Sequence, residues 1–179
     1  GAIMGIEAEH KQRMVAFVKC QGDCDHTNTA YHYTGVEDCR MLQYVPNHGP
    51  KSCNYGCQGY GSCVKVCAFD AIRIVNGVAV VDKDKCKACG KCVAVCPKHL
   101  IDLVPKSKTV HVACSSTEKG PIAMKACDTA CIACTLCVKN CPQEAIHIDN
   151  LHAVIDYDKC TSCGACMEKC PKKAIISQQ

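Results

Sequence analysis

The sequence contains no tryptophan and only two phenylalanines among its 179 residues. Large aromatic side chains supply much of the apolar area that an ordinary domain buries, so a conventional hydrophobic core is not expected. Something other than apolar burial must therefore stabilise the fold. The chain has 21 cysteines, and bound metal can fill this role because the free energy of ligation becomes free energy of folding.

The chain also lacks an apolar run of about 18 residues and a signal peptide. Neither a membrane-spanning helix nor export is expected for this stretch. The sequence opens with GAIMGIEAEH and no initiator methionine, which suggests a fragment whose upstream portion is missing. We expect residues 1 to 13 to end a helix and MVAFVKC at 14 to 20 to form a strand.

Catalytic and nucleotide-binding motifs are absent as well. No GxGxxG follows a strand to open a helix, so nicotinamide or flavin must bind to another chain. The eight histidines are scattered, and neither His99 nor His111, the two nearest to the cysteine strings, occupies a ligand position. We therefore expect no catalytic site in this chain.

Two cysteine strings carry the clearest signal, CIACTLCVKNCP at 131 to 142 and CTSCGACMEKCP at 160 to 171. Both follow CxxCxxCxxxCP, in which three thiolates hold one iron–sulfur cluster and the fourth ligates a second cluster. A structural zinc protein is the alternative of another class, but zinc takes four ligands from two separated pairs. The strings therefore predict 4Fe-4S clusters.

The first half repeats this pattern at an offset of 74 residues. The segment FDAIRIVNGVAVVDKDKC corresponds to QEAIHIDNLHAVIDYDKC, and Asn76-Gly77 in the first is a strong hairpin signal. Eight cysteines coincide without a gap. The pairs are Cys53 with Cys127, Cys57 with Cys131, Cys63 with Cys137, Cys67 with Cys141, Cys86 with Cys160, Cys89 with Cys163, Cys92 with Cys166 and Cys96 with Cys170.

This duplication predicts an α+β fold of tandem ferredoxin-like two-cluster modules with a cysteine-bearing N-terminal extension. The extension, with additional candidate ligands, covers residues 1–52. The first module covers 53–104, a strand-containing linker covers 105–126, and the second module covers 127–179.

The crossed ligation of two-cluster ferredoxins assigns sixteen cysteines to four clusters. The second module contributes Cys131, Cys134, Cys137 and Cys170 to one cluster, and Cys160, Cys163, Cys166 and Cys141 to another. The first module contributes Cys86, Cys89, Cys92 and Cys67 to a third, and Cys57, Cys63 and Cys96 to a fourth with Cys53 as a provisional ligand.

One position breaks the repeat, because Tyr60 lies opposite Cys134. Cys53 replaces the missing ligand in this assignment, and an exchange of Cys53 with Cys20, Cys24 or Cys39 stays open. Five cysteines remain unassigned: Cys20, Cys24, Cys39, Cys114 and Cys127. A fifth cluster needs four of them, and buried free thiols are the alternative.

The formal charge of +4 counts every cysteine as neutral. Four oxidised cubanes with their thiolates would make the loaded chain acidic, so this charge is no argument for nucleic acid as a partner. Lysines 83, 85, 87, 91 and 98 surround one string. They form either a solvated face that offsets cluster charge or a surface that attracts an acidic ferredoxin.

The runs VAFVKCQGDC, YTGVEDCR, KSCNYGCQGYGSCVKVCAFDAI and CKACGKCVAVCPKHLIDLVP closely resemble the B subunit of the Rnf complex in its long form. The resemblance extends from about Met14 to the C-terminus. That complex is a membrane-bound ferredoxin:NAD oxidoreductase that translocates Na+ or H+. In that family the B subunit starts with a membrane helix and a one-cluster domain, both absent here.

The resemblance implies an electron-transfer subunit that accepts electrons from reduced ferredoxin. Its partners would be other Rnf subunits, including the membrane-embedded ones and the NAD- and flavin-binding C subunit. It would lie at the cytoplasmic face of the cell membrane, peripheral in this portion. The alternative is an electron-transfer subunit of another soluble assembly, such as a formate dehydrogenase or heterodisulfide reductase.

Overall fold

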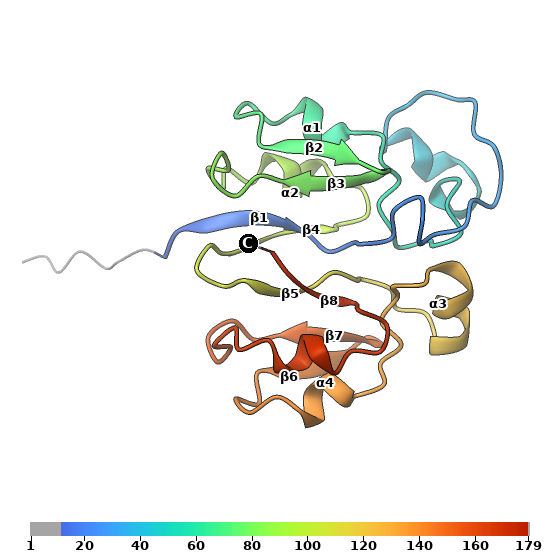
Figure 1. Ribbon diagram of the computed structural model, residues 1–179. Coiled ribbons are helices and arrows are strands. Elements are labelled where there is room, and N and C mark those ends of the chain that lie inside the picture. Colours follow the sequence, from blue (N-terminus) through green and yellow to red (C-terminus); the bar gives the residue numbers. More distant parts are fainter. Residues whose placement is uncertain (1–11, 179) are drawn as a thin grey trace, which may run out of the picture.

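The chain forms two similar units stacked one on the other in the computed structural model, which describes residues 12–178 (Figure 1). Each unit combines short helices with two-stranded antiparallel sheets. The predicted α+β class with tandem ferredoxin-like modules is confirmed. Most of the helix end expected for residues 1 to 13 lies outside the described residues.

The first unit contains four strands, two α-helices and two 3-10 helices. The strands are β1 (Met14–Val18), β2 (Ile72–Val75), β3 (Val78–Val81) and β4 (Ile101–Pro105). The helices are η1 (Met41–Tyr44), η2 (Pro46–His48), α1 (Ser62–Lys65) and α2 (Lys91–Val95). Strand β1 pairs with β4, and β2 pairs with β3.

The second unit repeats this order with a longer helix in place of the 3-10 turns. Its strands are β5 (Val110–Val112), β6 (Ile146–Asp149), β7 (His152–Ile155) and β8 (Ile175–Ser177). Its helices are α3 (Gly120–Ala126), α4 (Leu136–Lys139) and α5 (Ala165–Glu168). Strand β5 pairs with β8, and β6 pairs with β7.

The outer pairs β1–β4 and β5–β8 each join the beginning of a unit to its end. The strand expected at 14 to 20 is confirmed, and its residues Val15–Val18 are all buried. The module boundaries expected from sequence, at residues 53 and 127, would separate β1 from β4 and β5 from β8. In the structure these strands are hydrogen bonded to each other. Each unit therefore begins with its first strand, at Met14 and at Val110.

Both hairpins turn through two residues with positive φ. Asn76 and Gly77 have φ of 46° and 76°, and Asn150 and Leu151 have φ of 43° and 64°. This pattern matches the type I′ turn, whose twist suits the flanking strands. The hairpin predicted from Asn-Gly is therefore confirmed, and the second hairpin keeps the same turn with a leucine in the left-handed region.

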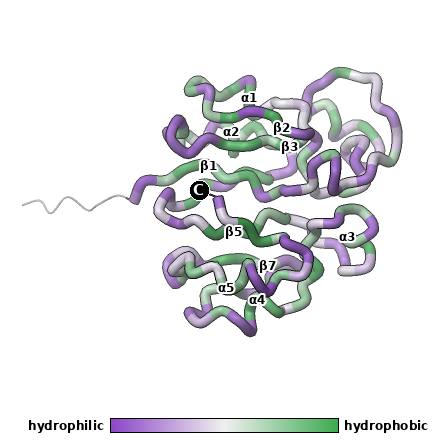
Figure 2. Tube along the Cα trace, viewed as in Figure 1, coloured by the Kyte–Doolittle hydropathy of each residue, from purple (hydrophilic) through white to green (hydrophobic). Residues whose placement is uncertain are grey.

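The apolar cores are thin and include cysteines. Apolar residues concentrate along β1 and β5 near the middle of the molecule (Figure 2). In the first unit Cys63, Cys86 and Cys92 belong to the buried cluster, and in the second Cys131, Cys137 and Cys166 do. The scarcity of aromatic residues therefore leaves sulfur as a main component of both interiors.

His111 connects the two units at their shared face. Its ring stacks on Phe17 with centroids 4.4 Å apart, and its Nδ1 shares a 2.7 Å hydrogen bond with the hydroxyl of Tyr157. Tyr157 packs against the cores of both units. On another side of the junction, Gln178 accepts a bond from Lys83 Nζ and donates to the Val81 carbonyl at 3.2 Å.

The burial of His111 predicts a pH dependence of stability. Desolvation, followed by the charge of Lys83, lowers the pKa of His111 to about 4. Because the unfolded chain binds this proton near pH 6.5, stability falls as the pH drops from there towards 4. Between pH 7 and 5.5 we expect a loss of about 1 kcal/mol, measured by anaerobic urea unfolding.

His111→Phe keeps the stacking on Phe17 and removes the titrating group, so its loss over this pH range should be smaller. His147→Phe is the matched control, because His147 is exposed on β6. An unchanged pH slope in the His111 variant would contradict this explanation.

Candidate metal centres

The first cavity, termed the Cys86 site, is formed largely by the string that begins at Cys86 and continues into α2. Four cysteines line it: Cys67, Cys86, Cys89 and Cys92. The string turns through Ala88 and Gly90, with φ of 52° and 77°. Backbone N–H groups of Ala16 and Ala71 donate to the sulfurs of Cys86 and Cys67 at 3.3 and 3.4 Å. Cys86 and Cys92 are buried, whereas Cys89 is exposed.

A second cavity, termed the Cys57 site, is lined in part by residues of α1. The cysteines that line it are Cys39, Cys57, Cys63 and Cys96. Burial, followed by the neighbouring Cys57, raises the pKa of the Cys63 thiol to about 12. The sequence assigned Cys53 provisionally to this set. The structure places Cys53 at a different cavity and brings Cys39 here from the loop before η1.

The loop that carries Cys39 is fixed to α1 by a polar network. The N–H of Cys39 donates to Ser62 Oγ, and that hydroxyl donates to Asp38, both at 2.9 Å. The guanidinium of Arg40 donates twice to Asp38 and holds the pKa of this carboxyl well below its usual range. Tyr60, the residue opposite Cys134, packs edge-on against Tyr33 instead. The fourth cysteine of the Cys57 site, Cys39, therefore comes from a loop outside the cysteine strings.

The second unit contains the counterparts of both cysteine sets. The Cys131 site is lined by Cys131, Cys134, Cys137 and Cys170. In the Cys160 site, buried Cys166 lies near Cys141 and Cys160, and its pKa is raised to about 11, chiefly by burial. Cys163 is exposed on the same loop. Ala145 and Ser162 donate N–H groups to Cys141 and Cys160 at 3.3 and 3.4 Å, as their equivalents do in the first unit.

A further cavity, termed the junction site, lies where the two units meet. None of the cysteines that line it belongs to a CxxCxxCxxxC string. Its cysteines are Cys20, Cys53, Cys114 and Cys127. Of the five cysteines left over by the sequence, three are here and Cys39 is at the Cys57 site. The fifth, Cys24, is exposed and its sulfur lies against the hairpin turn at Gly77.

The donor sets fit polynuclear clusters better than single ions. Among the described residues, no three His, Cys, Asp or Glu side chains come close enough to hold one metal ion. A cubane presents its four irons at separate corners, so its thiolates need not meet at a point. The cavities have sulfur at their walls, and backbone N–H groups point at those sulfurs, which favours the thiolate form needed for ligation.

Comparison with known proteins agrees with this chemistry. A family model described as a 4Fe-4S dicluster domain matches residues 130–175, and one described as a 4Fe-4S binding domain matches residues 79–102. The first match covers both strings of the second unit. The chain therefore binds multiple 4Fe-4S clusters.

Three relatives are similar over most of the chain, and each is the B subunit of an ion-translocating complex. The one from the Na(+)-translocating ferredoxin:NAD(+) oxidoreductase complex of Acetobacterium woodii is 48% identical over 88% of this chain and 47% of its own length. The one from the ion-translocating oxidoreductase complex of Methanosarcina acetivorans is 42% identical over 89% and 60%. The one from the proton-translocating ferredoxin:NAD(+) oxidoreductase complex of Clostridium ljungdahlii is 42% identical over 86% and 54%. The chain thus spans about half the length of these relatives.

Removal of iron is expected to unfold both units. Without clusters, each site keeps buried thiols around a void, and the thin apolar cores cannot compensate. Far-ultraviolet circular dichroism and thermal melting should show loss of a cooperative transition after anaerobic oxidation and chelation. Chelator without oxidation is the control, and an iron-free chain that melts like the loaded one would refute the expectation.

Proposed function

The chain is homologous over most of its length to B subunits of ion-translocating ferredoxin:NAD(+) oxidoreductase complexes, and on this premise we propose that it carries electrons within such a complex. Its donor would be reduced ferredoxin. Its partners would be the membrane-embedded subunits and the one that binds NAD and flavin. This portion would lie peripherally at the cytoplasmic face of the membrane. Among the described residues, no helix has the length and apolarity to cross a bilayer.

The observation that carries the proposal is that each unit brings two sets of cysteines to one short helix. In the first unit Cys63 lies within α1 and faces the Cys57 site, and Cys67 follows the helix and lines the Cys86 site. In the second unit Cys137 lies within α4 and Cys141 follows it, in the same arrangement. Cys63 and Cys67, like Cys137 and Cys141, are four residues apart, so the two clusters of a unit would be neighbours in space, as electron transfer requires.

We propose four clusters at these sites. Their ligands are the cysteines that define the Cys86, Cys57, Cys131 and Cys160 sites, with Cys39 rather than Cys53 in the Cys57 site. A bound 4Fe-4S cluster supplies one-electron oxidation and reduction at a potential set by its surroundings. The protein sets that potential by hydrogen bonds to sulfur and by solvent exposure, for example the N–H of Ala16 at Cys86 and the exposure of Cys89.

The surface around the Cys86 site supports docking of an acidic ferredoxin. Lys85, Lys87 and Lys91 are exposed there beside exposed Cys89. The other two lysines of the group are engaged elsewhere: Lys83 is buried and bonded to Gln178, and Lys98 donates to the Asn54 carbonyl at 2.7 Å. The lysines thus divide into a structural pair and an exposed group. The exposed group would attract a negatively charged donor.

Reversing the charges of Lys87 and Lys91 to glutamate should slow reduction by ferredoxin by roughly tenfold at low salt, because electrostatic steering then becomes repulsive. The difference from the unaltered chain should shrink as ionic strength rises. Stopped-flow bleaching of cluster absorbance measures this rate. Lys119→Glu with Lys125→Glu, at and within α3, is the matched control, and an equal loss at high and low salt would refute steering.

Replacing Cys39 with serine should lower the iron content by up to four atoms per chain, taking about four irons per cubane. Cys24→Ser is the matched control, because Cys24 lies in the same N-terminal segment but at none of the described cavities. Iron and acid-labile sulfide after anaerobic reconstitution give the measurement. Full iron content in the Cys39 variant would remove this cysteine from the ligand set.

Membership of the complex is tested separately by co-purification. Affinity-tagged chain, with its natural flanking segments, should retain membrane subunits in mild detergent. Recovery with a soluble dehydrogenase alone would favour the alternative assembly.

A further inference from the structure

We propose that the two units together bind a fifth 4Fe-4S cluster at the junction site, with Cys20, Cys53, Cys114 and Cys127 as its ligands. Neither unit holds this site alone, because each contributes two cysteines. The site goes beyond the four clusters proposed above, and it accounts for cysteines that the ferredoxin pattern leaves unused.

The four cysteines occupy equivalent positions in the two units. Cys20 lies two residues after the end of β1, and Cys114 lies two residues after the end of β5. Cys53 and Cys127 are matched by the repeat, each four residues before the first string cysteine of its unit. The structure therefore brings together two copies of one cysteine pair. A duplicated pair that converges on one cavity is the arrangement needed for four ligands around a cubane.

Backbone hydrogen bonds to these sulfurs repeat in the same way. The N–H of Cys57 donates to Cys20 Sγ, and the N–H of Cys131 donates to Cys114 Sγ, both at 3.3 Å. Cys20 also accepts from Gly22, and Cys114 accepts from Ser116, in each case two residues further along. Such N–H groups stabilise a thiolate that is bound to iron. The donors Cys57 and Cys131 belong to the Cys57 site and the Cys131 site, respectively.

Two glycines leave the space that converging sulfurs need. A β-carbon at Gly22 would lie 3.1 Å from the sulfur of Cys127 and 3.8 Å from that of Cys20. A β-carbon at Gly56 would lie 3.4 Å from the sulfur of Cys53 and 3.7 Å from that of Cys20. The sulfur of Cys20 is therefore close to those of both Cys53 and Cys127, although the latter comes from the other unit.

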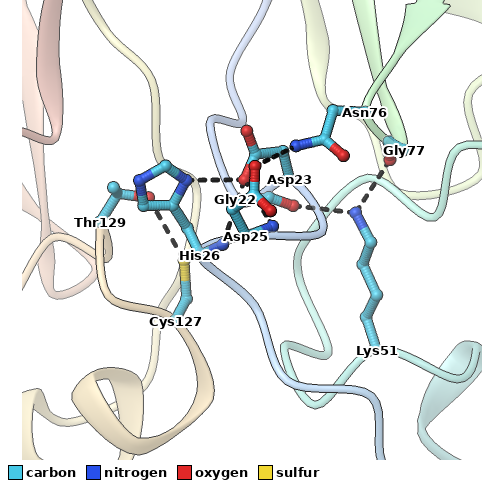
Figure 3. A network of polar contacts seen from close by, with 9 residues as sticks. All are labelled: Gly22, Asp23, Asp25, His26, Lys51, Asn76, Gly77, Cys127 and Thr129. Carbon is cyan, nitrogen blue, oxygen red and sulfur yellow. Dashed lines mark hydrogen bonds and ion pairs between the residues drawn. The ribbon is translucent and has the colours of Figure 1, made fainter.

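The loop after Cys20 is fastened to the second unit. Thr27 forms a β-bridge with Cys127, and Asp128 donates its N–H to the His26 carbonyl at 2.8 Å. Figure 3 shows Cys127 and Thr129 on one side of this loop and Lys51 on the other, with the sulfur of Cys127 3.4 Å from Thr129 Oγ1. Backbone segments from both units therefore meet beside the cavity.

A buried cation lies beside the junction site. Buried Lys51 donates to the carbonyls of Gly22 and Gly77, both at 2.8 Å, and lies near Cys20 and Cys57. A fixed cation beside the site offsets the negative charge of a cluster with four thiolates.

The junction site lies between the Cys57 site and the Cys131 site. One ligand of each, Cys57 and Cys131, donates its backbone N–H to a sulfur of the junction site. A cysteine set of each unit is therefore linked to this cavity by a single backbone hydrogen bond.

Iron and acid-labile sulfide per chain, measured on the anaerobically reconstituted full chain, test the proposal. Five cubanes require about 20 irons, and four require about 16. We expect about 20 in the unaltered chain and a loss of about four in Cys53→Ser with Cys127→Ser, from the same count of four irons per cubane. Cys24→Ser should keep the full content. Mössbauer spectroscopy of the same samples should show the loss confined to 4Fe-4S signals.

About 16 irons in the unaltered chain would overturn the proposal, as would one bound zinc per chain that disappears in the double variant. The measurement on the unaltered chain does not depend on how well the variant folds. The four-cluster proposal fails differently, through full iron content in Cys39→Ser or total iron well below about 16.

Discussion

Convergence of sulfur atoms from distant segments is the constraint on which this fold is built. The cores contain little aromatic area, and cysteines belong to the buried clusters of both units. Four thiolates must reach one cluster from a string and from a remote residue, as Cys67 does with the string that begins at Cys86. Short helices and hairpins suit this demand, because they bring segments together without large elements of their own.

Duplication gives the chain more than two copies of one module. Equivalent strands open each unit, equivalent N–H groups face equivalent sulfurs, and the two units pack through Phe17, His111 and Tyr157. The pairing of units creates a cavity lined by cysteines from both. A site at such a junction makes the relative placement of the units part of the metal chemistry, because its ligands separate when the units do.

Charge is arranged in two layers around the cavities. Buried Lys51 and Lys83 donate to backbone carbonyls and belong to the interior, whereas Lys87 and Lys91 face solvent near the Cys86 site. Lys51, which lies near Cys20 and Cys57, and the backbone N–H groups offset the charge of thiolate-bound iron. The exposed lysines carry the charge that a partner would meet. The formal net charge of the sequence counts buried and exposed lysines alike, so it does not distinguish these two roles.

The local features followed from sequence because they depend on spacing and turn chemistry. The strings of the second unit, the hairpin at Asn76-Gly77 and the strand at Met14 are of this kind. The fourth residue beside Cys57, Cys63 and Cys96 did not follow, because Cys39 reaches it through a loop fixed by Asp38 and Ser62. Likewise Cys127 was left over along the chain, and Cys53 was assigned provisionally to the site where Cys39 lies. Only packing of the two units decides that they meet, since that contact depends on surfaces far apart in sequence.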